Sequence, residues 1–466
     1  MPAFAWLGSR GDAGIHAGKA TAIDATLLVS CQYIQRSALL PIVLAVSYEF
    51  MAVNAEERFR EVAMGNVISR TLMCRDHEVL HFAYDPALRT VVGKPNITDP
   101  GHLPLGCLDN SGTFSSARLA QWLSSRAIPA TRPGLSSVLQ RLDLDTPEEL
   151  MAASLGLSLS DQYWLRPKGF TGAWQSVNYF NNPFSTALGE ALAPHDPDSG
   201  AESLARLGDD TTTTSAPDSS LNGNLPKRWE FIGGLPHLVK SGKPENLFQE
   251  PLNERVATLL CRRILTPGDY VPYELVQNGY PRYLSSCPCM VDENTEFVPA
   301  ADVIRSMKVR NELSRYEAFA AACETRGLHN AREQLAKMLV VDHIIANSDR
   351  HWGNFGVLMD SETREWVRMA PLFDMGEALW CDRALANDFS PYRMKCPMPF
   401  ARKIETQLER YAQGLSWLEA DRLVGFVDEA IGVLEFSRAL KDMPGRLSDI
   451  ATALESTVAD VTRLRA

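Results

Sequence analysis

Apolar residues recur at helical spacing immediately before the most polar loop of the chain. The apolar positions lie three or four residues apart, at Leu335, Met338, Val341 and Ile345. This periodicity ends at Asn347-Ser348, residue types that are typical of helix ends and turns. After Asn354, two short apolar runs flank a polar segment at 360–365, which is the pattern of a β-hairpin. The pattern therefore predicts a helix, a polar loop and a hairpin over residues 335–373.

A second hairpin, followed by a helix, is predicted between residues 227 and 265. Gly233-Gly234 separates the β-like runs 229–232 and 235–240, and glycines tolerate the positive φ angles that tight hairpin turns need. The next segment is apolar on one side of a helix, at Leu252, Val256, Leu259, Leu260 and Ile264. Before this hairpin, residues 195–220 are polar and low in complexity, so a solvated loop or linker is expected there.

The rest of the chain carries further element signals. Residues 80–84 and 89–93 read as a hairpin, and residues 115–126 read as a helix. Thr146-Pro147 marks a helix start, because threonine caps and proline fits the first helical position. Helices are also expected at the C-terminal end, over 400–415, over 417–434 and from Ser448 onward.

The first seventy residues are the least informative part of the chain. Their apolar run at 37–53 is short for a membrane span and is broken by Pro41. Met51, Met64 and Met73 leave the natural start position open. We therefore expect an extension of uncertain order over 1–70, followed by an N-terminal module over 71–205.

Composition limits the class of partner. The chain has 466 residues, enough for two or three domains, and a formal net charge of −11. This acidic balance argues against a nucleic-acid surface, which needs clustered Lys and Arg. The nine Cys are scattered, with only Cys287 and Cys289 close together, so reduced thiols in a cytoplasm are expected rather than disulfides or zinc.

Candidate chemistry lies in the polar loop after the helix at 335–345. Asp349 precedes Asn354 by five positions, the separation of a base and a metal ligand in the catalytic loop of phosphotransferases. Asp374 follows in Asp-Met-Gly, and Mg²⁺ prefers such oxygen ligands. Each residue alone would suit an ordinary turn. In this order they predict a phosphoryl-transfer centre, with Asp349 as base and Asn354 and Asp374 as metal ligands.

Lys240 is the candidate phosphate-binding lysine, because it ends the second strand of the hairpin that follows a glycine-containing loop. Glu254 lies in the first turn of the next helix and is expected to pair with it. A solvated lysine, and a glutamate that merely complements the helix dipole, are the simpler alternatives. The segment 287–290 is the candidate adenine contact, at Cys287 and Met290, and an ordinary buried strand end is the alternative there.

Together these motifs resemble the HipA-like serine/threonine kinases, a bacterial family. The matching positions are Ser220-x-x-Gly223-x-x-x-Lys227, Lys240, Asn253-Glu254, Asp349-Arg-His-x-x-Asn354 and Pro371-x-x-Asp374. The catalytic loop is also similar to that of phosphatidylinositol 3- and 4-kinases. The resemblance runs from about residue 145 to the C-terminus. The loop at 220–227 lacks the three-glycine pattern of ordinary protein kinases, and no antitoxin-pairing module is recognisable in residues 71–145.

The resemblance implies an α+β chain with an atypical two-lobed protein-kinase-like fold and an additional N-terminal α/β module. The N-lobe with phosphate loop and hinge would cover 206–300, and a helical C-lobe would cover 301–466. ATP would lie between the lobes, with Lys240 and the loop residues Ser220 and Gly223 at its phosphates. The family can phosphorylate its own loop, which implies Ser220 as an autophosphorylation site.

Two functions remain open at this point. The first is an ATP- and Mg²⁺-dependent kinase that acts on Ser or Thr. Its acceptor would be an unknown protein or the chain itself. The second is a pseudokinase, or a nucleotide-binding interaction module without turnover. A lipid kinase is a weaker option because no basic membrane-facing patch is visible. The kinase interpretation places the chain in a bacterial cytoplasm, with no direct nucleic-acid or membrane partner.

Overall fold

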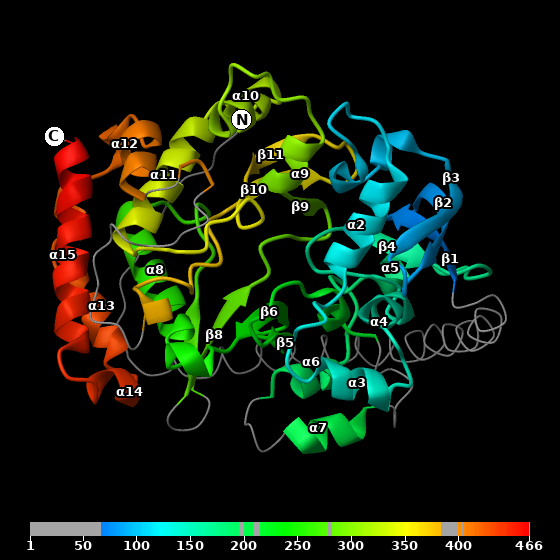
Figure 1. Cartoon of the computed structure of the whole chain (residues 1–466), viewed down its shortest axis with the longest axis horizontal. Helices are drawn as coiled ribbons and strands as arrows, with labels where there is room; N and C mark the ends of the chain where they lie inside the picture. Colours follow the sequence, from blue (N-terminus) through cyan, green and yellow to red (C-terminus); the bar gives the residue numbers. More distant parts are fainter. Residues whose placement is uncertain are drawn as a thin grey trace, which may run out of the picture.

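The computed structural model describes residues 67–194, 200–207, 215–277, 282–383, 399–401 and 404–465. Within them, the strands form three antiparallel sheets in the orders β3-β2-β1-β4, β5-β6-β8-β7 and β11-β10-β9. In Figure 1 the first sheet lies at the right and the long C-terminal helix at the left. The mixed helix and sheet content predicted from the sequence is confirmed.

The first sheet consists of β1 (Ile68–Cys74), β2 (His77–Asp85), β3 (Thr90–Ile97) and β4 (Tyr163–Arg166). Its predicted hairpin is confirmed by the pairing of β2 with β3. Helix α2 (Ser116–Arg126) confirms the helix expected over 115–126, packs on this sheet and is capped by the Ser115 hydroxyl. β1 begins at Ile68, two residues before the boundary expected at residue 70, and pairs on both sides, with β2 and with β4.

Short helices connect this sheet to the second one. They are α3 (Leu135–Arg141), α4 (Pro147–Ala153), α5 (Trp174–Val177), α6 (Ala187–Leu192) and α7 (Gly200–Arg206). The predicted start of α4 is confirmed, since the Thr146 hydroxyl accepts from the N–H of Glu149 at 3.2 Å. The expectation of an uninterrupted loop over 195–220 was wrong. Helix α7 packs against α6, and Leu207 is buried with Leu188 and Leu192 in one apolar cluster. The threonine run at 211–214 lies outside the described residues.

The second sheet contains β5 (Lys227–Ile232), β6 (Leu235–Lys240), β7 (Glu274–Gln277) and β8 (Tyr283–Pro288). The Gly-Gly hairpin is confirmed, with φ of +62° at Gly233 and +86° at Gly234. Helix α8 (Glu250–Ile264) follows, as predicted, and packs against β7 and β8. This packing places the end of β6 beside the first turns of α8.

The described residues of the C-terminal half contain most of the longer helices of the chain. The helices are α9 (Ala300–Arg305), α10 (Arg315–Thr325), α11 (Ala331–Ile344), α12 (Ile404–Tyr411), α13 (Phe426–Leu434), α14 (Arg438–Lys441) and α15 (Arg446–Arg465). They share one large apolar core with α8. The helix predicted over 417–434 is wrong in its first half, because Gly425 has a φ of +76° and α13 begins only after it.

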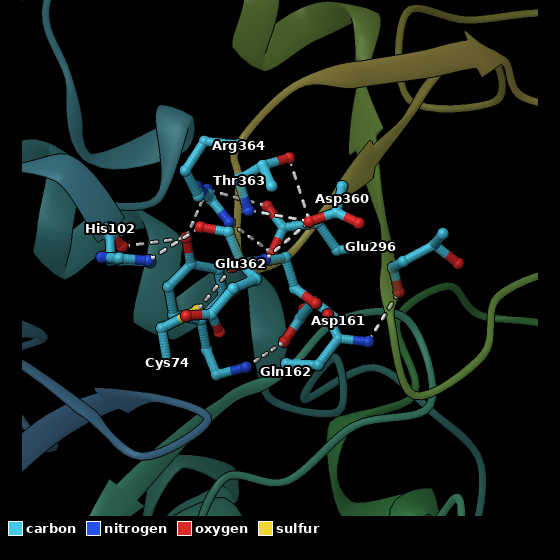
Figure 2. Close-up of polar contacts among 12 residues, drawn as sticks. Cys74, His102, Asp161, Gln162, Glu296, Asp360, Glu362, Thr363 and Arg364 are labelled. Atoms are coloured by element: carbon cyan, nitrogen blue, oxygen red, sulfur yellow. Dashed lines mark hydrogen bonds and ion pairs between the residues drawn. The ribbon is translucent and has the colours of Figure 1, made fainter.

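The third sheet joins the two halves of the chain. It contains β9 (Thr295–Pro299), β10 (Gly356–Asp360) and β11 (Trp366–Met369), and the predicted β10–β11 hairpin is confirmed. Gln162, just before β4, donates from Nε2 to the carbonyl oxygen of Thr295 at 2.6 Å. Figure 2 shows Arg364, from the β10–β11 turn, pointing toward Glu296. Its guanidinium also donates to the Tyr163 hydroxyl at 2.7 Å. The first sheet is therefore bonded directly to the third.

Two further expectations can be compared with the described residues. The seven cysteines within them are all free thiols. No helix in the described ranges combines the length and apolar character needed to cross a membrane. The apolar run at 37–53 lies outside the described residues, as do Met51 and Met64, whereas the third alternative start, Met73, lies in β1.

Candidate functional site

Lys240 occupies the end of β6 and contacts two acidic side chains. Its Nζ donates to Glu254 Oε1 at 2.8 Å and to Asp374 Oδ1 at 2.6 Å. A third contact, to the Tyr273 hydroxyl, measures 3.3 Å. The predicted pairing of Lys240 with Glu254 is confirmed. Because the lysine side chain is only 5% exposed, the alternative of a solvated strand residue is wrong.

Lys240, Glu254 and Asp374 shift one another's pKa values. Burial raises the pKa of Asp374, but the ammonium groups of Lys240 and Lys227 outweigh it and hold this pKa well below its usual range. Burial lowers the pKa of Lys240, and the two carboxylates outweigh that effect and raise it well above normal. Burial also raises the pKa of Glu254, against the lowering effect of Lys240. The group therefore holds a charged lysine beside a charged Asp374.

Lys227 is a second lysine at this site, and the sequence interpretation assigned it no role. It begins β5 and lies opposite Lys240 in the strand register. Burial, with Lys240 as a neighbouring like charge, lowers the pKa of Lys227 to about 8 even though Asp374 opposes the shift. Glycine suits position 223 for two reasons. Its φ is +89°, and a Cβ there would lie only 2.8 Å from Lys227 Nζ. The strand pairing of 227 with 240 was the signal that could have found Lys227.

The loop after α11 is held by a buried ion pair. Arg350 is fully buried and donates to Asp342 on α11, with Nε to Oδ2 at 2.9 Å and Nη2 to Oδ1 at 3.0 Å. Its Nη1 donates to the carbonyl oxygens of Asn354 and Phe373, the latter at 2.8 Å. One guanidinium thus fixes the spacing between the 349–354 loop and the segment that carries Asp374. Arg350 was assigned no role from the sequence, because nothing in the sequence marks Asp342 as its partner.

Asp349 and Asn354 lie in the same loop with defined orientations. The Asn354 Nδ2 donates to the Asp349 carbonyl oxygen at 3.0 Å, which leaves its Oδ1 as an acceptor. Burial raises the pKa of the Asp349 carboxyl, His351 lowers it, and Asp374 and Glu377 raise it further. A carboxylate with a raised pKa is better suited to accept a proton than an ordinary one.

A single cavity of about 600 Å³ brings most of these residues together. Among the predicted site residues, those that line it are Ser220, Gly223, Lys240, Asp349, Asn354 and Asp374. Lys227, Lys243 and Glu377 line it too, as do Arg126, Asp161 and Glu296 from the junction of the first and third sheets. The cavity therefore extends from the lysine and carboxylate group to the wall built by the N-terminal sheet.

Three predicted site residues do not line this cavity. Glu254 lies behind Lys240, where its Oε2 also accepts from the N–H of Met375 at 3.0 Å. Cys287 is buried in a small apolar cluster with Val271 and Tyr273, and Met290 packs against that cluster. The adenine contact expected from Cys287 and Met290 thus lies apart from the cavity and stays a prediction.

The two histidines near the loop have local partners. His343 is buried on α11, and its Nε2 lies 3.3 Å from Asp460 Oδ2 on α15. His351 is exposed, and its Nδ1 accepts from the N–H of Gly353 at 3.0 Å. His343 thus has a structural role between α11 and α15, and His351 stabilises its own turn.

A separate group of metal-capable side chains lies at the edge of the first sheet. His77, Asp99 and His102 are close enough to share an ion. The two imidazole rings are stacked, with centroids 3.9 Å apart and planes at 15°, so their in-plane lone pairs run nearly parallel and do not converge. His102 Nδ1 already lies 2.6 Å from Asp99 Oδ2, and Figure 2 shows His102 beside Glu362. This group is better described as part of the contact with the β10–β11 turn.

Comparisons with known proteins return only remote likenesses. No family model and no curated protein matches the sequence. A proinflammatory kinase of Helicobacter pylori, CtkA, is similar over 51% of this chain and 94% of its own, at 15% identity and a TM-score of 0.38. A chain from the Shewanella oneidensis toxin–antitoxin complex of HipA, HipB and operator DNA covers 84% of this chain and 97% of its own, at 15% identity and a TM-score of 0.46. Likenesses this weak establish no activity, so the function depends on the geometry of the site.

Proposed function

We propose that the chain is an ATP- and Mg²⁺-dependent phosphotransferase, a HipA-like kinase whose acceptor is a serine or threonine hydroxyl of a protein. The observation that carries this proposal is the contact of Lys240 with both Glu254 and Asp374 at the edge of a cavity that Asp349 and Asn354 also line. Lys240 and Asp374 are 134 positions apart in the chain. A strand lysine, a helix glutamate, a catalytic-loop aspartate and a second acidic metal ligand are the working parts of kinases.

The proposal also assigns the larger parts of the fold. The sheet β5-β6-β8-β7 with α8 would be the small lobe, and the helices from α10 onward would be the large lobe. The cavity between them supplies the space for the phosphates. Its volume, about 600 Å³, falls in the range of small-molecule sites.

Asp349 acts in the proposed reaction as the base. It accepts the proton of the acceptor hydroxyl as that oxygen bonds to the γ-phosphorus. The bond from the γ-phosphorus to the bridging oxygen breaks, and ADP keeps the electron pair. Burial and the nearby carboxylates favour proton uptake by Asp349, because they raise its pKa.

Lys240 and Lys227 bind the phosphates, and Glu254 orients Lys240. The donor set for a hard cation is present, since Asn354 Oδ1 and the carboxylate of Asp374 are oxygen ligands and Asp374 stays ionised. Mg²⁺ held there would neutralise charge on the β- and γ-phosphates. Lys240 holds the Asp374 carboxylate, and the buried Arg350, paired with Asp342, holds the backbone at Phe373 beside it.

Ser220 is the proposed site of autophosphorylation. Its hydroxyl donates to the Leu157 carbonyl oxygen at 2.6 Å and is half-buried. It lines the same cavity as Asp349. The loop would have to release the Leu157 contact before the hydroxyl could act as acceptor.

The alternative is a nucleotide-binding module without turnover, which would use the same cavity but would need no base. The region expected to hold adenine, near Cys287 and Met290, is packed with Val271 and Tyr273, and this packing bears equally on both functions. Incubation of the purified protein with radiolabelled ATP and Mg²⁺, together with a mixture of generic protein acceptors, separates the two functions. Transfer of label to protein supports the kinase if it is lost in both Asp349→Ala and Asp374→Ala. Binding of ATP with equal background label in all three proteins would instead support the module.

A further inference from the structure

Arg132 lies outside every motif noticed in the sequence, yet it makes the densest set of contacts to the loop at 220–227. It lies in the turn between α2 and α3 and is only 3% exposed. Its guanidinium donates to three successive carbonyl oxygens. Nη2 lies 2.7 Å from that of Leu221 and 3.3 Å from that of Asn222, and Nε lies 3.1 Å from that of Gly223. A neighbour in the same turn, Thr131, donates its hydroxyl to Asn224 Oδ1 at 2.8 Å.

The geometry of the peptide bond gives these contacts a consequence. In a trans peptide the C=O and the following N–H point in opposite directions. With the carbonyls of 221–223 directed at Arg132, the N–H groups of Asn222, Gly223 and Asn224 must point away from it. Among the described residues, the N–H groups of Asn222 and Asn224 have no hydrogen-bond partner, and that of Gly223 reaches only the adjacent Asn222 Oδ1.

The side away from Arg132 is the cavity side. Residues 220–225 all line the cavity with Lys227 and Lys240, whereas Arg132 does not. The N–H groups of Asn222 and Asn224, with that of Gly223 bonded only to a neighbouring side chain, lie beside two lysines and form a site for a multiply charged anion, since backbone amides and ammonium groups both favour phosphate oxygens. An uncharged ligand would gain little from them.

We propose that Arg132 is a positioning residue for the nucleotide phosphates: it holds the carbonyls of the 221–223 segment on one side and so presents the backbone amides of 222–224 to the phosphates on the other. This inference rests on the proposed function and adds to it. The N-terminal region then helps to build the phosphate site rather than merely flanking it. Arg132 itself touches no phosphate.

The test compares the affinity for ATP with the affinity for adenosine, measured by isothermal titration calorimetry on the full chain with Mg²⁺. Adenosine lacks the phosphates, so a phosphate-specific defect weakens ATP alone. For Arg132→Gln we expect ATP affinity to fall by roughly tenfold or more, as loss of one or two charge-assisted hydrogen bonds implies, with adenosine affinity unchanged. Arg132→Lys should show a smaller loss, because one ammonium cannot reach all three carbonyls.

Arg141→Gln is the matched control. Arg141 also donates to two backbone carbonyl oxygens, those of Leu207 at 2.7 Å and Ala205 at 2.8 Å, but it lies away from the cavity. It should leave the ratio of ATP to adenosine affinity at the wild-type value. If Arg132→Gln does not fold, Arg132→Lys with an unchanged Tm decides the matter, and an unaltered ratio in it overturns the inference.

The remaining outcomes are distinct. Equal losses of ATP and adenosine affinity in the Arg132 variants would indicate general damage and overturn the inference, while the proposed function would stand. A wild-type protein that binds ATP no better than adenosine would overturn both.

Discussion

Lys240 Nζ and Asp374 Oδ1 lie 2.6 Å apart, although the two residues are separated by 134 positions in the chain. The bridge joins the end of β6 to the segment after β11. Phosphates bound as proposed would therefore have to compete with a contact that already exists inside the protein.

Replacing Lys240 should destabilise the protein before any ligand is considered. Lys240→Met leaves Glu254, which is 2% exposed, without its cation. Removing one partner of a buried pair costs about 3–5 kcal/mol, because the other charge stays buried. We expect a loss of that size in urea unfolding. The double variant Lys240→Met with Glu254→Gln should recover part of it, and a double loss equal to the sum of the two single losses would mean that the residues do not interact.

Asp349 should matter for turnover and not for nucleotide binding. In Asp349→Asn the amide cannot accept the hydroxyl proton, so the rate of phosphoryl transfer should fall by roughly 10²–10⁴-fold. ATP affinity should stay within about twofold of wild type, since the phosphate-binding lysines are intact. Rates from radiolabel transfer and affinities from calorimetry check both parts. The exposed Asp442→Asn serves as the control, and an equal rate in the two variants would exclude Asp349 as the base.

Asn354 should affect the Mg²⁺ concentration that the reaction requires. Asn354→Ala removes one proposed oxygen ligand and keeps Asp374, so the Mg²⁺ concentration for half-maximal activity should rise by about tenfold or more. Activity should return at high Mg²⁺. Chelation by EDTA should abolish transfer in the wild type. A variant with an unchanged Mg²⁺ requirement would place the metal elsewhere.

Asp218 should give stability a distinctive dependence on pH. Burial raises the pKa of its carboxyl to about 7, while one oxygen accepts from the N–H of Trp229 at 2.9 Å. A folded-state pKa above the unfolded value means that the native state binds the extra proton. This contribution is therefore fully present below about pH 4 and declines as pH rises toward 7.

The variant Asp218→Asn isolates this effect, because an amide does not titrate. The difference in unfolding free energy between wild type and variant should fall by roughly 1.4 kcal/mol per pH unit between pH 4 and 7, then level off. Urea unfolding at several pH values measures it. A flat difference would show that Asp218 titrates normally.

The sequence revealed the parts of the site whose signals are local. The Gly233-Gly234 turn, the apolar face of α8 and the order of Asp349, Asn354 and Asp374 each occupy a short stretch. Arg132 was missed, and Lys227 and Arg350 were noted only as motif positions without a role, because their contacts depend on partners brought close only by folding. Every residue has a backbone carbonyl, so a sequence pattern cannot show which carbonyl oxygens Arg132 binds. Its contacts with those of residues 221–223 appear only in the structure.

The same limit applies to the fold. β4 pairs with β1 across about ninety positions of the chain. In neither strand do apolar and polar residues alternate clearly enough to predict this pairing. The short helix α7 was hidden in a polar stretch whose composition suits a loop. The adenine contact expected at Cys287 and Met290 depends on how tightly the chain packs around them, which the sequence does not show.

The hydrogen bonds from Gln162 to the carbonyl oxygens of Asp292 and Thr295 have a practical consequence for truncated forms of the protein. A fragment that starts beyond β4 would lack the Gln162 donor, so both carbonyl oxygens would lose this hydrogen bond. The ion pair of Arg364 with Glu296 would also lose its contact with Tyr163 of β4. Inactivity of such a fragment would then report a damaged scaffold rather than an absent catalytic group.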